Sequence, residues 1–84
     1  MGIVFVMPIY YFNIHNDTET FDDEGKELAD LDAAIAYATA GVRSLAADTV
    51  SKGHLIGHHR IEIVDHDGKL LRTVRFDDAV DIQP

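Results

Sequence analysis

The chain has 84 residues and no cysteine, so we expect one small domain that packing or association stabilises without disulfides. Fifteen acidic residues against seven lysines and arginines give a formal charge of −8 at pH 7. This balance argues against nucleic-acid partners and anionic membrane surfaces, because both bind clustered cations.

The first predicted element is a strand from Ile9 to Ile14, in which Tyr10, Phe12 and Ile14 alternate onto one face. After a turn at Asn16-Asp17, we expect the segment Glu19–Asp22 to pair back as a weak second strand. Residues 1–6 are interpreted as an N-terminal extension or an extra strand. Strand edges in a small sheet can recruit a copy or a partner peptide, and the edges expected here are Tyr10–Ile14 and Ile3–Val6.

A long helix is predicted from Leu31, with Asp30 as its N-cap, to Ser51. Gly53 then offers the left-handed conformation that often ends a helix. The expected core stripe consists of apolar residues three and four positions apart: Leu31, Ala34, Ile35, Ala38, Val42, Leu45, Ala46 and Val50.

A β-hairpin follows, formed by Arg60–Val64 and Lys69–Phe76. Asp67-Gly68 predicts a two-residue type I′ turn between these strands, because both central residues of that turn need a positive φ. Ile61 and Ile63 share one face, whereas the pattern does not decide the faces of Leu70 and Leu71.

Together these elements predict an α+β domain of order β-β-α-β-β that spans residues 1–84. We expect a four-stranded antiparallel sheet with one long helix packed on one face.

The order of the motifs resembles a family of short bacterial proteins of unknown function. The matching stretches are Met7-Pro-Ile-Tyr-Tyr-Phe12, the alanine-rich helix with the acidic segment before it, and Arg60-Ile-Glu-Ile-Val64 with Val74-Arg-Phe76. Members begin Met-Pro-x-Tyr-Tyr-Phe, so the resemblance implies a domain over residues 7–80, preceded by an extension. The family carries no established activity or catalytic residues that could be transferred.

Five histidines suggest a metal site, because neutral imidazole is a common ligand. Adjacent His58 and His59 would point to opposite faces of a strand, however, so convergence within one chain is not expected. A site shared between subunits through His54 and His58 stays open as the alternative, and we otherwise expect no metal and no cofactor.

Acidic residues cluster in two places. Asp65-His-Asp-Gly68 has the beginning of a calcium loop without the remaining ligands, which favours a simple hairpin turn. Asp22, Asp23 and Glu24 form either a solvated loop or an acidic surface that binds a basic protein.

The helix face opposite the core stripe carries small residues and one aromatic residue where Lys and Glu would be usual. Small side chains permit close approach, and tyrosine is common at interfaces. The candidate interface consists of Ala33, Ala36, Tyr37, Ala40 and Ser44.

We therefore expect a cytoplasmic, non-enzymatic interaction or regulatory module that forms a homo-oligomer, with a dimer favoured and a basic protein as a further partner. The alternative is a metal- or ligand-sensing domain with histidines at a subunit interface. Catalysis is disfavoured because a domain with one helix leaves little concave volume for a pocket of several hundred Å3.

Overall fold

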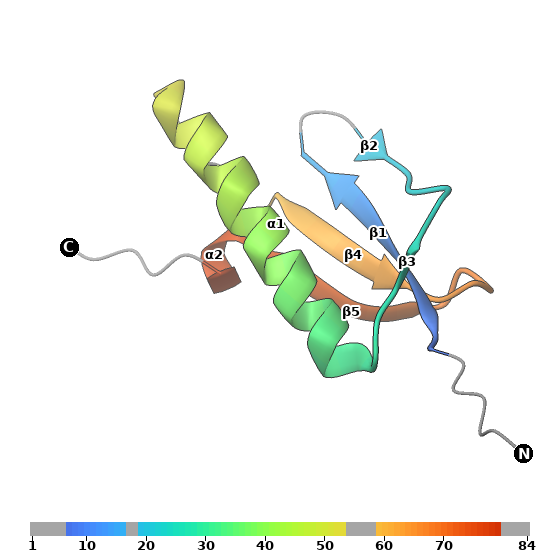
Figure 1. The fold of residues 1–84 in the computed structure, drawn as a ribbon. Coiled ribbons are helices and arrows are strands. Elements are labelled where there is room, and N and C mark those ends of the chain that lie inside the picture. The colour runs from blue at the N-terminus through green and yellow to red at the C-terminus, as the bar shows by residue number, and fades with distance from the viewer. Residues whose placement is uncertain (1–6, 17–18, 54–58, 80–84) are drawn as a thin grey trace, which may run out of the picture.

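The computed structural model describes residues 7–16, 19–53 and 59–79 and has the predicted α+β architecture (Figure 1). The strands are β1 (Ile9–His15), β2 (Glu19–Thr20), β3 (Lys26–Glu27), β4 (Arg60–Val64) and β5 (Leu70–Arg75). The helices are α1 (Leu31–Ser51) and α2 (Phe76–Ala79). The sheet is antiparallel in the order β2-β1-β4-β5, and α1 packs on one of its faces. The fold class is thus confirmed, with β3 as an additional short strand.

Strand β1 lies inside the sheet and not at its edge, so the expectation of a free Tyr10–Ile14 edge is wrong. On one side it pairs along its length with β4, with Phe12 opposite Ile63. On the other side it pairs with β2 near its end, where Ile14 lies opposite Thr20, and with β3 near its start. The predicted strand Glu19–Asp22 is therefore only two residues long, and the chain leaves β1 before it returns as β3. The other expected edge, Ile3–Val6, lies outside the described residues.

Helix α1 begins and ends as its sequence predicts. The Asp30 side chain accepts a hydrogen bond from the Ala33 amide (2.9 Å), and Gly53 follows the helix with a φ of +93°. The helix buries small side chains against the sheet, which allows a close approach: Ala34, Ala38, Val42 and Ala46. Val50 was expected in the core stripe but is 56% exposed. No helix in the described part of the chain is long and apolar enough to cross a membrane.

The hairpin turn differs from the predicted type I′ turn. Gly68 has a φ of +81°, but Asp67 does not have a positive φ, so the two-residue turn is wrong. Instead, the Gly68 amide donates to the Asp65 carbonyl (3.0 Å) and the Asp65 amide donates to the Lys69 carbonyl (3.0 Å). These bonds define a three-residue loop that ends in a left-handed glycine. The Asp65 carboxylate stabilises it by accepting from the amides of Asp67 and Lys69 (both 2.9 Å).

A β-bulge resolves the open question about Leu70 and Leu71. Ile63 pairs with Arg72 while the next residue, Val64, pairs with Leu70, so Leu71 is the extra residue of β5. The bulge breaks the simple alternation along β5, and Leu71 packs against the core although Leu70 is exposed.

The last element, α2, was not predicted, because Phe76 was expected to end the strand. Phe76 is buried, and its amide donates to the His59 carbonyl (2.8 Å), which extends the ladder between β4 and β5. Arg43 of α1 donates through Nε to the Ala79 carbonyl (2.9 Å), which fastens α2 to the long helix.

Gly25 is required at the start of β3 for two separate reasons. Its φ is +73°, and a Cβ atom there would lie 2.5 Å from Ile9 Cγ2 and 2.9 Å from Tyr11 Cε1. We expect Gly25→Ala to lower the free energy of unfolding by more than about 2 kcal/mol, because the clash adds to the roughly 1–2 kcal/mol cost of a left-handed alanine. Urea unfolding measures this change.

Gly68→Ala is the matched control, since Gly68 has a similar φ and nothing lies within 4 Å of the added methyl group. It should lose only the backbone contribution. Equal losses in the two variants would show that the contacts with Ile9 and Tyr11 have no effect.

Candidate functional site

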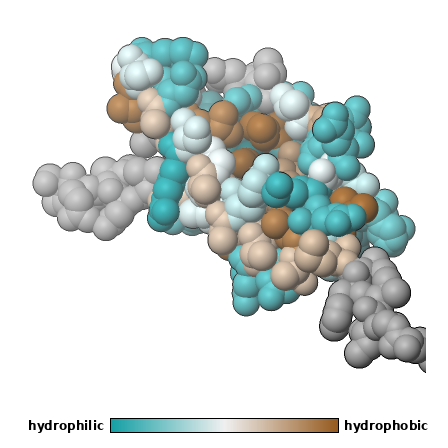
Figure 2. Space-filling model, in the orientation of Figure 1, coloured by the Kyte–Doolittle hydropathy of each residue, from teal (hydrophilic) through white to brown (hydrophobic). Residues whose placement is uncertain are grey.

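A groove of about 700 Å3 lies between α1 and the outer side of β1. Its apolar lining comes from Phe12 and Ile14 of β1, Ile61 of β4 and Leu45 of α1. Figure 2 shows this hydrophobic surface in the hollow between the helix and the strands beside it. The sequence-based argument that so small a domain leaves little concave volume is therefore wrong, although the groove is wide and open.

The predicted interface residues divide between the groove and the outer surface of α1. Tyr37, Ala40 and Ser44 line the groove on its helix side. Ala36 is exposed and Ala33 is half-buried, and neither of them lines the groove. The structure thus assigns three of the five candidates to the lip of a concave surface, which the helical pattern alone did not indicate.

Tyr37 closes part of the groove. Its ring packs against Phe12 with 4.8 Å between ring centroids, and Lys26 Nζ lies 5.2 Å from the centroid of the Tyr37 ring. The Tyr37 side chain therefore connects the helix with both β1 and β3. It is still 48% exposed, so its outer side remains accessible.

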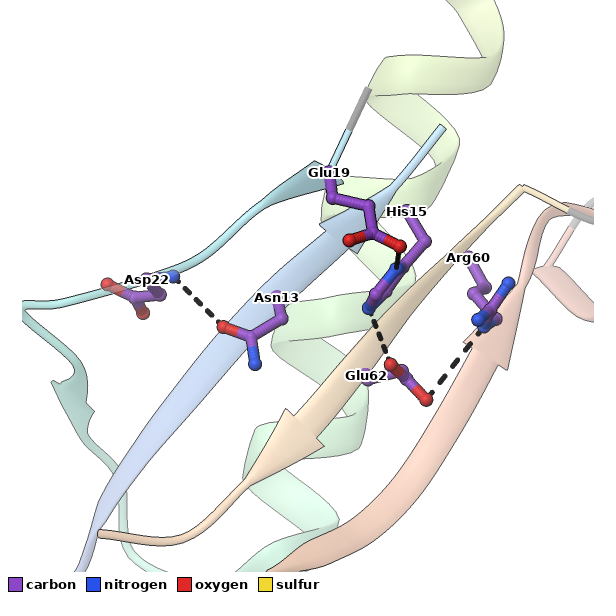
Figure 3. Close-up of polar contacts among 6 residues, drawn as sticks. All are labelled: Asn13, His15, Glu19, Asp22, Arg60 and Glu62. Carbon is purple, nitrogen blue, oxygen red and sulfur yellow. Dashed lines mark hydrogen bonds and ion pairs between the residues drawn. The ribbon is translucent and has the colours of Figure 1, made fainter. Parts of the chain in front are cut away.

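The wall segment, residues 21–25, forms part of the opposite side of the groove and connects β2 with β3. Asp22 attaches this segment to β1: its Oδ2 accepts from the Phe12 amide (3.1 Å), and the Asp22 amide donates to Asn13 Oδ1 (2.9 Å; Figure 3). Asp22 Oδ1 also accepts from the amides of Glu24 (3.0 Å) and Gly25 (3.1 Å). One carboxylate thereby fixes the shape of the segment and its position on the sheet.

These hydrogen bonds also set the charge of Asp22. Partial burial raises the pKa of its carboxyl group. The hydrogen bonds from the amides of Gly25, Phe12 and Glu24 together lower this pKa by more than burial raises it, so the net pKa lies below its ordinary value. Asp22 is therefore ionised at neutral pH, with three backbone amides bound to its oxygens. Of the three residues predicted to form an acidic surface, Asp23 and Glu24 are exposed, whereas Asp22 is half-buried and bound to β1.

A second polar cluster lies on the sheet face opposite α1. His15 of β1 points with Nδ1 toward Glu19 of β2 (3.4 Å) and with Nε2 toward Glu62 of β4 (2.5 Å; Figure 3). Arg60 Nε lies 3.9 Å from the other oxygen of Glu62. The His15 and Glu62 side chains are only 13% and 24% exposed, and Glu19 is largely exposed.

The sequence analysis missed this cluster because it considered histidines of the C-terminal half. The residues lie together because of the register: His15 is directly opposite Arg60, and Glu62 is two residues further along β4 on the same face of the sheet. The alternation in the hairpin placed Glu62 on the face away from the core. That pattern did not show that β1 is the strand that pairs with β4 on the side away from β5.

The predicted metal and turn residues have different positions. His54 and His58 lie outside the described residues. His59 is buried and packs edge to face against Phe76, with 5.5 Å between centroids. Asp65, His66 and Asp67 bring potential ligand atoms within 4.8 Å of one another, but Asp65 already binds the backbone of the turn. The interpretation of this segment as a turn is confirmed.

Comparison with known proteins identifies a family and no function. Residues 9–77 match the model of a family with the description "Domain of unknown function (DUF6894)". Searches of curated proteins and of solved structures find no match.

The bonds of Asp22 predict a stability effect with a defined pH dependence. Asp22→Asn should lower the free energy of unfolding at pH 7 by about 1–3 kcal/mol, because the amide group cannot accept from all three backbone amides. The folded-state pKa is depressed, so the contribution of Asp22 is complete above the ordinary aspartate pKa of about 3.9 and is lost as the pH falls through the folded-state value. The difference between the variant and the parent should therefore shrink below about pH 4.

Chemical denaturation at pH 7 and pH 3 measures both effects. Asp23→Asn is the control, since Asp23 is the exposed neighbour, and it should change stability by less than about 0.5 kcal/mol. A pH-independent loss in Asp22→Asn would contradict the ionised hydrogen-bonded carboxylate.

Proposed function

We propose that this chain, which belongs to the DUF6894 family, is a small non-enzymatic interaction module that self-associates through the groove between α1 and β1. The observation that carries the proposal is the groove itself, in which Phe12, Ile14 and Leu45 lie beneath a lip of small helix residues. Apolar surface of this kind gains free energy when a second protein surface removes it from water.

A second copy is the occupant that the shape of α1 favours. When two copies of α1 pack antiparallel around a twofold axis, the residue numbers of any two facing positions add up to the same total. This rule gives the facing pairs for any chosen position of the axis. With a twofold axis that passes the exposed face of α1 midway between Ala40 and Ser44, the exposed Tyr37 of one copy lies opposite the exposed Ala47 of the other, and Ala40 lies opposite Ser44. Each contact then occurs twice, as an isologous interface requires, and at both ends the large Tyr37 side chain meets the small Ala47.

Ala40 sits at the centre of this arrangement, and its substitution tests it. We expect Ala40→Glu to weaken self-association at least about tenfold, because a carboxylate placed between two helices is desolvated without a partner. Ala40 is exposed in the single chain, so the variant should keep its fold. Sedimentation velocity over a dilution series measures the association, and circular dichroism measures the fold.

Val50→Glu is the matched control, because Val50 is an exposed residue of the same helix that does not line the groove. Its association should be unchanged. A parent chain that sediments as a monomer at all concentrations, or equal effects of the two substitutions, would refute the proposal.

Two further predictions of the sequence analysis are tested in the same series. A basic protein that binds near Asp23 and Glu24 would show an affinity that falls with added salt. Association that depends on added zinc would instead favour the metal-sensing alternative with His54 and His58.

A further inference from the structure

We propose that the outer edge of β5, on the side away from β4, binds an extended acidic peptide as an added strand of the sheet. This edge is separate from the groove, which lies beside β1 and the wall segment. The inference therefore does not depend on the proposed self-association. Three observations carry it: the direction of the backbone groups of β5, a carboxylate that already binds this edge, and two exposed cations beside it.

Strand β5 forms a border of the sheet (Figure 1). It is the last strand in the order β2-β1-β4-β5, and no strand in residues 7–16, 19–53 or 59–79 pairs with its outer side. The bulge at Leu71 leaves Arg72–Arg75 as the regular part of this edge. An edge strand presents amides and carbonyls that an extended peptide can pair with.

The hydrogen-bond pattern shows which backbone groups point outward. In an antiparallel ladder, pairs that bond to each other alternate with pairs whose backbone groups point away from each other. The Phe76 amide donates to the His59 carbonyl (2.8 Å), so this pair and every second pair along β5 are bonded to β4. The residues between them, Thr73 and Arg75, therefore direct their amides and carbonyls away from β4. The Arg75 amide agrees with this direction, because it donates to Asp78 (3.2 Å).

The contacts at the end of β5 indicate the chemistry that this edge binds. The Asp78 carboxylate accepts from the Arg75 amide, which is the role that a carbonyl of an added strand would have. The neighbouring Asp77 accepts two hydrogen bonds from the Arg75 guanidinium group (3.0 and 2.8 Å). An acidic segment of the chain itself thus occupies one end of the edge, and the outward backbone groups of Thr73 continue the surface beyond it.

Two cations lie beside the rest of the edge. Lys69 and Arg72 are exposed, and neither side chain has an ion-pair partner among the described residues. Arg72 is opposite Ile63, so it lies on the same face of the sheet as α1. Two copies of β5 that paired with each other would bring these positive charges together, which disfavours self-pairing at this edge. A strand of opposite charge gains an attraction at the same positions.

The probe is a capped, fluorescently labelled peptide with the sequence Thr-Val-Glu-Glu-Val-Thr. Consecutive side chains of a strand point to opposite faces, so one glutamate lies on the face of Arg72 in either orientation. Fluorescence anisotropy with the full chain measures binding in about 0.15 M salt, which screens the repulsion from the distant acidic surface. We expect saturable binding, at least about tenfold tighter than that of the matched peptide Thr-Val-Lys-Lys-Val-Thr.

Two substitutions test the edge itself. Arg72→Gln should weaken binding of the glutamate peptide about two- to fivefold, the usual effect of an exposed ion pair. Lys52→Gln is the matched control, because Lys52 is an exposed cation at the end of α1, and it should bind like the parent. Thr73→Pro removes an outward amide without removing a bond to β4, and it should weaken binding at least about threefold.

Modified peptides test strand addition without any change in the protein, so they decide the matter even if Thr73→Pro does not fold. Two versions of the glutamate peptide carry N-methyl groups on alternate amides, one version on the odd positions and one on the even positions. Only one set of amides can face β5, so one version should lose binding while the other keeps it. In the bound complex, hydrogen exchange of the Thr73 amide should also slow.

The outcomes separate this inference from the proposed function. Equal binding of the glutamate and lysine peptides, equal binding of the two N-methylated versions, or no saturable binding would each refute strand addition at β5. Ala40→Glu should bind the peptide like the parent, because Ala40 lines the groove and not this edge. A monomeric chain that binds the peptide refutes only the proposed function, and a self-associating chain that does not bind it refutes only this inference.

Discussion

The hydrogen bond between the Phe12 amide and Asp22 is the contact on which the arrangement of the groove depends. Strand β1 runs through the middle of the sheet, but its outer neighbour consists of two separate pairs of residues. Between them the chain bends away and leaves the partly buried Phe12 amide without a strand partner, which costs free energy unless another acceptor binds it. A side-chain carboxylate takes the position of the missing strand, and the wall of the groove begins at this point.

The same use of aspartate recurs elsewhere and explains part of the acidic composition. Asp30 accepts from the first turn of α1, Asp65 accepts from the hairpin turn, and Asp78 accepts from the Arg75 amide at the end of β5 (3.2 Å). Each of these carboxylates satisfies backbone donors where regular pairing stops. A formal charge of −8 therefore overstates the free acidic surface, because some of these carboxylates are structural.

Sequence reasoning succeeded where the signal was local. The spacing of apolar residues, Asp30 and Gly53 defined α1 correctly, since helix periodicity and capping depend on neighbours in the chain. It found β2 but predicted it two residues too long, and it missed β3, because strands of two residues show no alternation. Val50 was wrongly assigned to the core stripe. The apolar spacing continues to the end of α1, but the last turn of the helix, where Val50 lies, is not covered by the sheet.

The candidate site was predictable only in part for a related reason. Tyr37, Ala40 and Ser44 were identified from the helix alone, because they are unusual on a solvent-facing side. Their role as a groove lip depends on the position of the wall segment, which follows from the contact between Asp22 and β1. The His15 cluster likewise requires the register between β1 and β4, which joins residues almost fifty positions apart.

The two polar clusters have different roles because their partners differ. Asp22 binds uncharged backbone amides, which keep the same hydrogen-bonding capacity at every pH near neutrality, so its attachment is permanent under those conditions. His15 instead lies between two carboxylates, with Nδ1 3.4 Å from Glu19 and Nε2 2.5 Å from Glu62, and both of these partners are side chains of neighbouring strands. The wall segment is therefore held to β1 in two ways: by the backbone amides that Asp22 binds, and by the backbone pairing of β3 with Ile9 and Tyr10.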